Sequence, residues 1–169
     1  MITFSRRAML KQLSALLGGA VLTACGASAP SNPAADAAKP KPTSNPNAPA
    51  ITLDISVKGE ELKFDKEQLE APAGSRITVR LNNTSAATPH NWVLVTAGSE
   101  EAVGNDGISA GEKNSYIKPN DPRVLAFTKL AGPRATVDVT FDAPPAGTYT
   151  YICTFPGHHF LMKGKLVIK

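Results

Sequence analysis

Three residue types that bind soft metals occur at short spacing near the C-terminal end of the sequence. Cys153 is followed after four residues by His158, and Met162 follows after three more. One loop can bring their thiolate, imidazole and thioether toward a single point. Two imidazoles and a thiolate with a weak axial thioether form a blue-copper centre. The spacing therefore predicts a copper site that needs one further imidazole.

His90 is the candidate for the missing imidazole, because it stands directly before the apolar segment 91–95. The third histidine, His159, is expected to face solvent. Soft sulfur ligands favour Cu(I), whereas imidazole also suits Cu(II), so neither oxidation state has its preferred geometry. Little then needs to move when the charge changes, as fast one-electron transfer requires. The alternatives are a buried structural thiol at Cys153 and a surface residue at His90.

The elements that must position these residues are predicted to be short strands. Residues 51–57 and 76–81 alternate apolar and polar side chains with period two, the pattern of a half-buried strand. Further candidates are residues 91–95, 135–141, 148–153 and 163–168. Many short strands separated by Gly, Pro, Asn and Asp predict an all-β Greek-key sandwich or barrel. The longer insert 98–123 could hold one short helix.

Residues 1–24 are predicted to be a signal peptide. Their apolar run, residues 12–24, ends in small residues and is short for a membrane span. Residues 5–11 resemble a twin-arginine export motif, and residues 22–25 resemble a lipobox. An uncleaved membrane-anchoring helix is the alternative. We expect export, and a lipid on Cys25 that holds the protein at the outer, periplasmic face of the cell membrane.

Residues 25–50 are predicted to be a tether between this lipid and the folded domain. Positions 26–50 contain six Pro and eight Ala, and they lack Val, Ile, Leu and aromatic residues. Such a composition cannot bury enough apolar surface to offset the entropy of ordering. A Pro-rich chain favours an extended polyproline conformation. The folded domain is therefore expected to cover residues 51–169.

The formal net charge of +4 comes from outside this domain. Residues 51–169 carry 13 Lys and Arg against 13 Asp and Glu. A neutral domain lacks the basic surface that nucleic-acid binding needs, so no nucleic-acid partner is expected. Neutrality also predicts that encounters with partner proteins depend only weakly on salt.

Three segments of this domain resemble azurin. Residues 153–164, CTFPGH and then LMKG after two further residues, are similar to its copper loop. Residues 90–94, HNWVL, resemble its first ligand strand, and residues 118–130 are also similar. The resemblance covers residues 51–169. The predicted lipoprotein tether and the missing N-terminal disulfide resemble auracyanin, the azurin-like protein of filamentous photosynthetic bacteria.

This resemblance implies an eight-stranded cupredoxin fold and one type 1 copper per chain. It implies His90 and His158 as nitrogen ligands, Cys153 as the thiolate and Met162 as the axial ligand. In azurin a backbone carbonyl of a glycine approaches the opposite axial side. Here that residue is Pro89, whose φ is fixed, and a contact from its carbonyl is left open.

The resemblance also implies residues that support the ligands. Backbone N–H groups of Asn91 and Phe155 would point at the Cys153 sulfur and stabilise the thiolate. The Asn91 side chain could tie the His90 strand to the copper loop. An ordinary asparagine at a strand edge is the alternative.

The implied function is that of a mobile electron carrier. Phe160 and Leu161 are expected to form an apolar rim around the exposed edge of His158, suited to brief docking through a small interface. By resemblance, the donor would be a membrane quinol-oxidising complex and the acceptor a c-type cytochrome or a reaction centre. A monomer is expected.

Two other functions use the same residue types. A periplasmic copper-binding chaperone or storage protein is the alternative, but such proteins usually present several exposed Met or Cys residues. A mature chain that begins at Cys25 would keep Met162 as its only methionine. A copper enzyme needs a second metal site built from further histidines, and only His159 is left. We therefore expect an electron-transfer protein and not an enzyme.

Overall fold

The computed structural model describes residues 47–169, and the predictions for the signal peptide, for Cys25 and for the tether up to residue 46 lie outside the described residues. Within residues 47–169 there are eight strands, one α-helix and two short 3-10 turns. The strands are β1 (Ala50–Ser56), β2 (Gln68–Ala71), β3 (Arg76–Asn82), β4 (Val93–Val95), β5 (Val124–Phe127), β6 (Thr136–Asp142), β7 (Gly147–Ile152) and β8 (Lys163–Ile168). The helical elements are α1 (Glu100–Ala110), η1 (Glu112–Asn114) and η2 (His158–Phe160).

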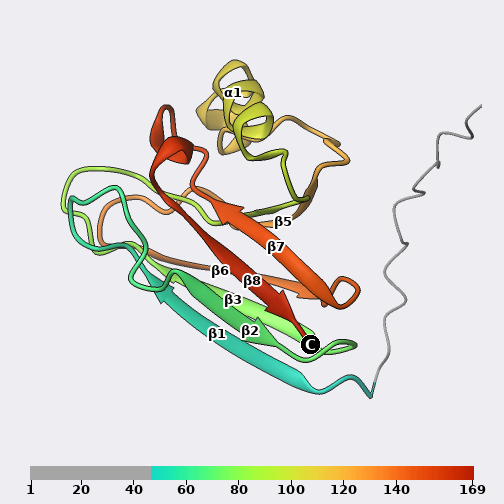
Figure 1. The fold of residues 1–169 in the computed structure, drawn as a ribbon. Coiled ribbons are helices and arrows are strands. Elements are labelled where there is room, and N and C mark those ends of the chain that lie inside the picture. Colours follow the sequence, from blue (N-terminus) through green and yellow to red (C-terminus); the bar gives the residue numbers. More distant parts are fainter. Residues whose placement is uncertain (1–46) are drawn as a thin grey trace, which may run out of the picture. The chain divides into compact units, whose positions relative to one another are not determined.

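The strands form two sheets that face each other (Figure 1). One sheet has the order β1-β3-β6 and the other the order β2-β8-β7-β4-β5. The pairs β1–β3 and β2–β8 are parallel, and the remaining pairs are antiparallel. The predicted all-β sandwich is confirmed, as is the short helix within the insert 98–123. The four-residue strands β2 and β5 were missed, because segments this short carry little alternation.

Alternation along the strands builds the core between the sheets. In β3, the side chains of Ile77, Val79 and Leu81 are fully buried, while the intervening residues face outward. The outward Arg76 and Arg80 form ion pairs with Asp142 and Asp138 of the neighbouring β6. Trp92 is fully buried in this core.

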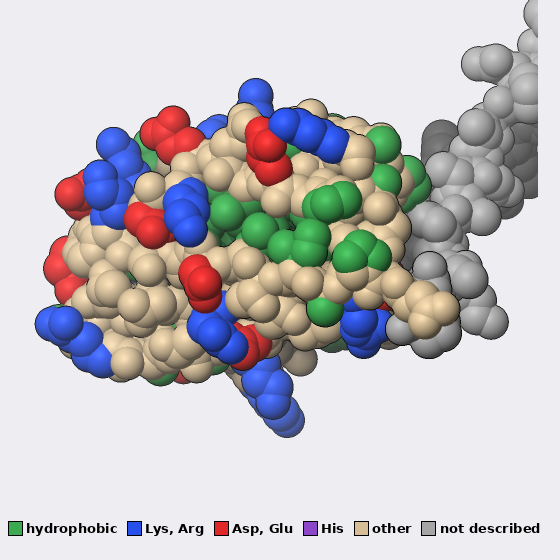
Figure 2. All heavy atoms as spheres, turned by 90° about the horizontal axis from the view of Figure 1, so that it is seen from below, with side chains coloured by type: hydrophobic (Ala, Val, Ile, Leu, Met, Phe, Trp, Pro, Cys, Tyr) green, Lys and Arg blue, Asp and Glu red, His purple; other side chains and the backbone are tan. Residues whose placement is uncertain are grey.

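The face shown in Figure 2 carries both signs of charge. Lys and Arg side chains are interspersed with Asp and Glu around a central group of hydrophobic side chains. Neither positively nor negatively charged side chains dominate this face. Among residues 47–169, no helix has the length and apolar character needed to cross a membrane.

The strand pairing brings the predicted ligands to one end of the sandwich. β4 and β7 are antiparallel neighbours, with Val93 opposite Ile152. The residues just before β4 and just after β7 must therefore emerge at the same end of the sheet. His90 and Cys153 occupy these places. In Figure 1, α1 and the loop that carries η2 also lie at this end.

Candidate metal centre

The loop from Cys153 to Met162 is closed by its own backbone. The Cys153 N–H donates to the Met162 carbonyl at 3.0 Å, and the Met162 N–H donates to the His158 carbonyl at 2.8 Å. The His158 N–H donates to the Phe155 carbonyl at 2.9 Å. Three of the predicted ligands are thus held on one short, hydrogen-bonded loop.

His90 is fixed from the opposite side by a two-way backbone bridge. Its N–H donates to the Ala131 carbonyl at 3.0 Å, and the Ala131 N–H donates to the His90 carbonyl at 2.8 Å. The buried Asn83 side chain donates to the carbonyls of Thr88, Ala131 and Gly132 at 2.9–3.0 Å. These bonds set the position of the backbone that carries the His90 ring.

Three donor atoms meet at this end of the sandwich. The Cys153 Sγ lies 3.7 Å from His90 Nδ1 and 3.7 Å from His158 Nδ1. All three atoms lie within 4.8 Å of one another, and no other group of three His, Cys, Asp or Glu donors comes so close within residues 47–169. The exposed fractions are 0% for Cys153, 1% for His90 and 8% for His158. Met162 is fully buried and belongs to the same hydrophobic cluster as Cys153.

Burial prepares the two imidazoles to donate lone pairs. Burial, with the charge of the nearby His158 as a second cause, lowers the pKa of His90 to about 4. Burial also lowers the pKa of His158. Both rings are therefore neutral at pH 7, the form in which histidine binds metal ions.

The thiol of Cys153 needs a cation before it can ionise at neutral pH. Burial raises its pKa to about 11, and hydrogen bonds from the Asn91 and Phe155 N–H groups act in the opposite direction. A metal ion takes the place of the thiol proton when such a site is loaded. Two neutral imidazoles, a thiol and a buried thioether form a donor set that suits copper, so the residues fit this metal.

The buried side chain of Asn91 joins three segments around the site. Its Nδ2 donates to the Ser115 carbonyl and to Thr154 Oγ1, each at 2.8 Å. Its Oδ1 accepts from the Thr154 N–H at 2.8 Å. Asn91 therefore links the His90 strand to the loop that starts at Cys153, and it also holds the segment after η1.

Comparison with known proteins identifies the family. The profile of copper binding proteins of the plastocyanin/azurin family matches residues 51–169. The chain is 49% identical over 120 residues to auracyanin-A of Chloroflexus aurantiacus, which covers 70% of this chain and 74% of that protein. It is 39% identical over 131 residues to azurin of Bordetella pertussis, a match that covers 71% of this chain and 87% of that azurin.

The chain belongs to the plastocyanin/azurin family of copper binding proteins. The solved structure of auracyanin A, described as a "blue" copper protein, superimposes with a TM-score of 0.69 at 48% identity. That match covers 71% of this chain and 99% of auracyanin A. The predicted resemblance to azurin and auracyanin is confirmed. The chain is a copper-binding electron-transfer cupredoxin and not an enzyme.

The surroundings of His158 in this cupredoxin are aromatic and apolar. The Phe155 ring lies 4.7 Å from the His158 ring and 5.3 Å from the Tyr116 ring, measured between centroids. Phe160 and Leu161 are 55% and 66% exposed. Pro89 is half-buried directly before His90, and a contact from its carbonyl stays a prediction.

The expectation that His159 faces solvent is wrong. Its side chain is only 2% exposed, and neither ring nitrogen has a hydrogen-bond partner among residues 47–169. The ring lies beneath α1, where Gly104 has no side chain to exclude it. The two glycines at positions 104 and 107 of the expected helix were the sequence signal that a neighbouring segment packs closely there.

Two groups of supporting residues were also missed. Ser115 and Tyr116 are consecutive non-glycine residues with φ of 54° and 56°, a conformation that costs about 1–2 kcal/mol per residue. This turn presents the Ser115 carbonyl to Asn91, and the Ser115 Oγ accepts from the Leu130 N–H at 3.1 Å. Turn sequences of this kind carry no clear sequence signal.

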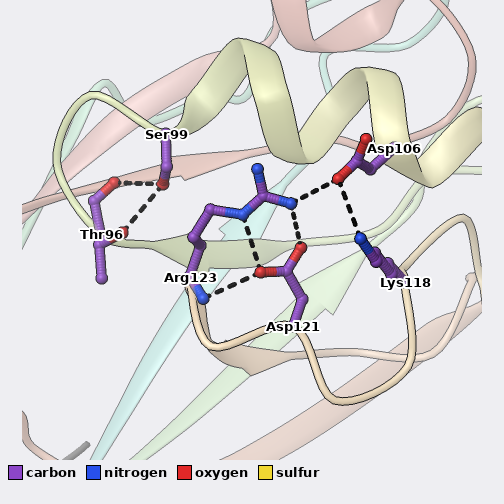
Figure 3. A network of polar contacts seen from close by, with 6 residues as sticks. All are labelled: Thr96, Ser99, Asp106, Lys118, Asp121 and Arg123. Carbon is purple, nitrogen blue, oxygen red and sulfur yellow. Dashed lines mark hydrogen bonds and ion pairs between the residues drawn. The ribbon is translucent and has the colours of Figure 1, made fainter. Parts of the chain in front are cut away.

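The second group is the ion-pair network shown in Figure 3. Arg123 donates to Asp121 Oδ1 at 2.8 Å and to Asp106 Oδ2 at 2.6 Å. Lys118 also pairs with Asp106, at 3.6 Å. Because Asp106 lies on α1, the network fixes this helix to the loop before β5.

Proposed function

We propose that this copper protein is a mobile one-electron carrier anchored to the outer face of the cell membrane by a lipid on Cys25. It would take electrons from a membrane quinol-oxidising complex and pass them to a c-type cytochrome or a reaction centre. The observation that carries the proposal is the convergence of His90, Cys153 and His158 within 4.8 Å, next to an exposed apolar rim.

Backbone hydrogen bonds hold the ligand loop closed, and one ligand ring reaches the surface. Bound copper would supply a Cu(II)/Cu(I) couple, with His90, Cys153, His158 and Met162 as the residues that hold it. Of the three clustered donors, His158 is the most exposed, at 8% against 1% for His90 and 0% for Cys153. Its ring edge is therefore the shortest way for an electron to reach a partner protein.

The rim consists of Phe160 and Leu161, the two most exposed large hydrophobic side chains beside His158. Apolar side chains at this place exclude water from a docked partner and form no fixed ion pairs, which suits brief encounters. The equal numbers of acidic and basic residues in 51–169 predict weak steering by charge.

Burial disfavours the alternative of a copper chaperone or storage protein. Cys153 and Met162 are fully buried, and backbone hydrogen bonds close the loop between them. Copper transfer to another protein would require this loop to open locally, at a free-energy cost that slows exchange. An electron can cross the rim without such opening.

Electron transfer to a c-type cytochrome tests the carrier function. In stopped-flow experiments, Leu161→Gln should lower the second-order rate constant about tenfold, because lost apolar burial of about 1.4 kcal/mol corresponds to that factor. Ile108→Gln, at another exposed apolar residue, is the matched control and should leave the rate unchanged. A rate that falls steeply with salt, or one that Leu161→Gln does not alter, would contradict the proposed docking.

Membrane fractionation of the full chain tests the anchor. Cys25→Ala should move the protein from the membrane fraction to the soluble exported fraction. Retention of this variant in the membrane would instead support an uncleaved N-terminal helix.

A further inference from the structure

The buried face of α1 contains two glycines, Gly104 and Gly107, next to Val103. Glycine inside a helix is destabilising relative to alanine, so these positions need a separate explanation. Neither glycine has a positive φ, and backbone conformation does not require them. The requirement is space for what lies against the helix.

At both positions a side chain would collide with the copper loop or with the segment that supports it. A Cβ at Gly104 would fall within 2.5 Å of Cδ2 and Nδ1 of His159 and would also overlap Cγ. A Cβ at Gly107 would overlap the Tyr116 carbonyl and lie 3.7 Å from the Thr154 Cβ. Real Cβ atoms essentially never come within 3.0 Å of other heavy atoms.

These contacts reach the immediate neighbours of two predicted ligands. His159 follows His158 in η2, and Thr154 follows Cys153. The helix thus lies directly on both ends of the segment between the thiolate and the imidazole. Asp106, between the two glycines, is held by Arg123 (Figure 3), so α1 cannot move away from the loop before β5 without breaking this ion pair.

His159 places its buried ring between η2 and Gly104 of α1. Its ring is 98% removed from solvent, and it lies 4.0 Å from the Phe160 ring, between centroids. The absence of a side chain at position 104 and the large ring at position 159 are complementary in volume. A Cβ added at position 104 must therefore displace the ring at position 159 or the helix.

The geometry points to Gly104 and His159 as a pair of positioning residues that set the location of the His158 ring. The ring of His159 acts as a spacer against α1, and Gly104 provides the room for it. This inference rests on the proposed function, since His158 is the ring through which the electron would pass. It adds that a helix outside the ligand set determines the geometry of the copper site.

A double-mutant cycle tests the pair with Gly104→Ala, His159→Ala and the combination of both. The first readout is taken on the metal-free protein: the midpoint of denaturant unfolding, and the NMR chemical shifts of the His158 ring and of the amides in the copper loop. The second readout is the visible and EPR spectrum after Cu(II) is added. Asn105→Ala, at an exposed position of the same helix, is the matched control; it gains helix propensity, so it should not lower the midpoint, and it should leave the His158 signals and the copper spectrum unchanged.

We expect Gly104→Ala to lower the midpoint, to shift the His158 signals and to change the copper spectrum. The combined variant should return all three to the values of His159→Ala, because the ring that collides with the new Cβ is gone. A Gly104→Ala variant that fails to fold, while the combined variant folds, supports the inference equally.

Three results would overturn it: a Gly104→Ala protein with wild-type signals, additive effects of the two changes, or a combined variant that also fails to fold. If the wild-type protein gives no blue spectrum, the proposed function fails. The metal-free stability and NMR readouts still decide whether Gly104 and His159 position His158.

Discussion

Replacing Asn91 with alanine should destabilise the metal-free protein severely. The change removes three side-chain hydrogen bonds of 2.8 Å, two donated by Nδ2 and one accepted by Oδ1. It also leaves the buried N–H of Thr154 without its acceptor. The strained turn at Ser115 loses the closer of the two donors to its carbonyl and keeps only Thr154 Oγ1 at 3.4 Å.

The magnitude follows from these contacts. Three hydrogen bonds contribute about 1 kcal/mol each, and a buried donor left without a partner costs at least about 1 kcal/mol more. The free energy of unfolding should therefore fall by about 4 kcal/mol. Domains of this size are stable by only about 5–15 kcal/mol, so the variant would lose a large part of its stability.

Urea unfolding of the metal-free protein measures this loss, followed by the fluorescence of the single, buried Trp92. Asn114→Ala is the matched control, since Asn114 is exposed and its side chain donates one bond of 2.8 Å, to the Ala110 carbonyl. The control should lose less than about 1 kcal/mol. The reasoning is refuted if Asn91→Ala is no more destabilised than Asn114→Ala.

Three further results are expected. Cys153→Ser should abolish the blue colour of the copper-loaded protein, because the sulfur-to-copper charge-transfer transition disappears; a variant that remains blue in visible spectroscopy would rule out Cys153 as the thiolate. Met162→Leu should keep the colour and raise the potential in a redox titration, because Cu(II) loses more from a missing axial donor than Cu(I) does; a lowered potential would contradict the axial role. Hydrogen bonds and ion pairing with Arg123 hold the pKa of Asp121 below its ordinary value of 3.8. The ionised Asp121 therefore stabilises the fold fully above pH 3.8. This stabilisation is lost as the pH falls through the lower pKa that Asp121 has in the folded protein. The stability difference between wild type and Asp121→Asn should therefore narrow as urea unfolding is repeated from about pH 5 toward pH 2, whereas a constant difference would show that the ionised carboxylate contributes nothing.

The parts of the molecule that the sequence predicted are those encoded by short-range patterns. Alternation along residues 76–81 reflects a strand with one buried face, and the structure has β3 there. The Cys-x4-His-x3-Met spacing lies within one loop, so a local sequence describes most of the metal centre. His90 was found because it directly precedes an apolar strand.

The parts that could not be predicted depend on contacts between distant segments. The burial of His159 depends on the missing side chain at Gly104, which lies on another element. The ion pair between Arg123 and Asp106 likewise exists only because α1 folds back over the loop before β5. Spacing along the chain does not report such contacts.

The most direct test of the copper site is to add Cu(II) to the purified domain, residues 47–169, and record its metal stoichiometry with its visible and EPR spectra. We predict one copper per chain, an intense blue absorption band and the narrow copper hyperfine splitting of a thiolate-bound type 1 site. A colourless complex with the EPR spectrum of ordinary tetragonal copper would contradict the assignment of His90, Cys153 and His158 as ligands of one ion.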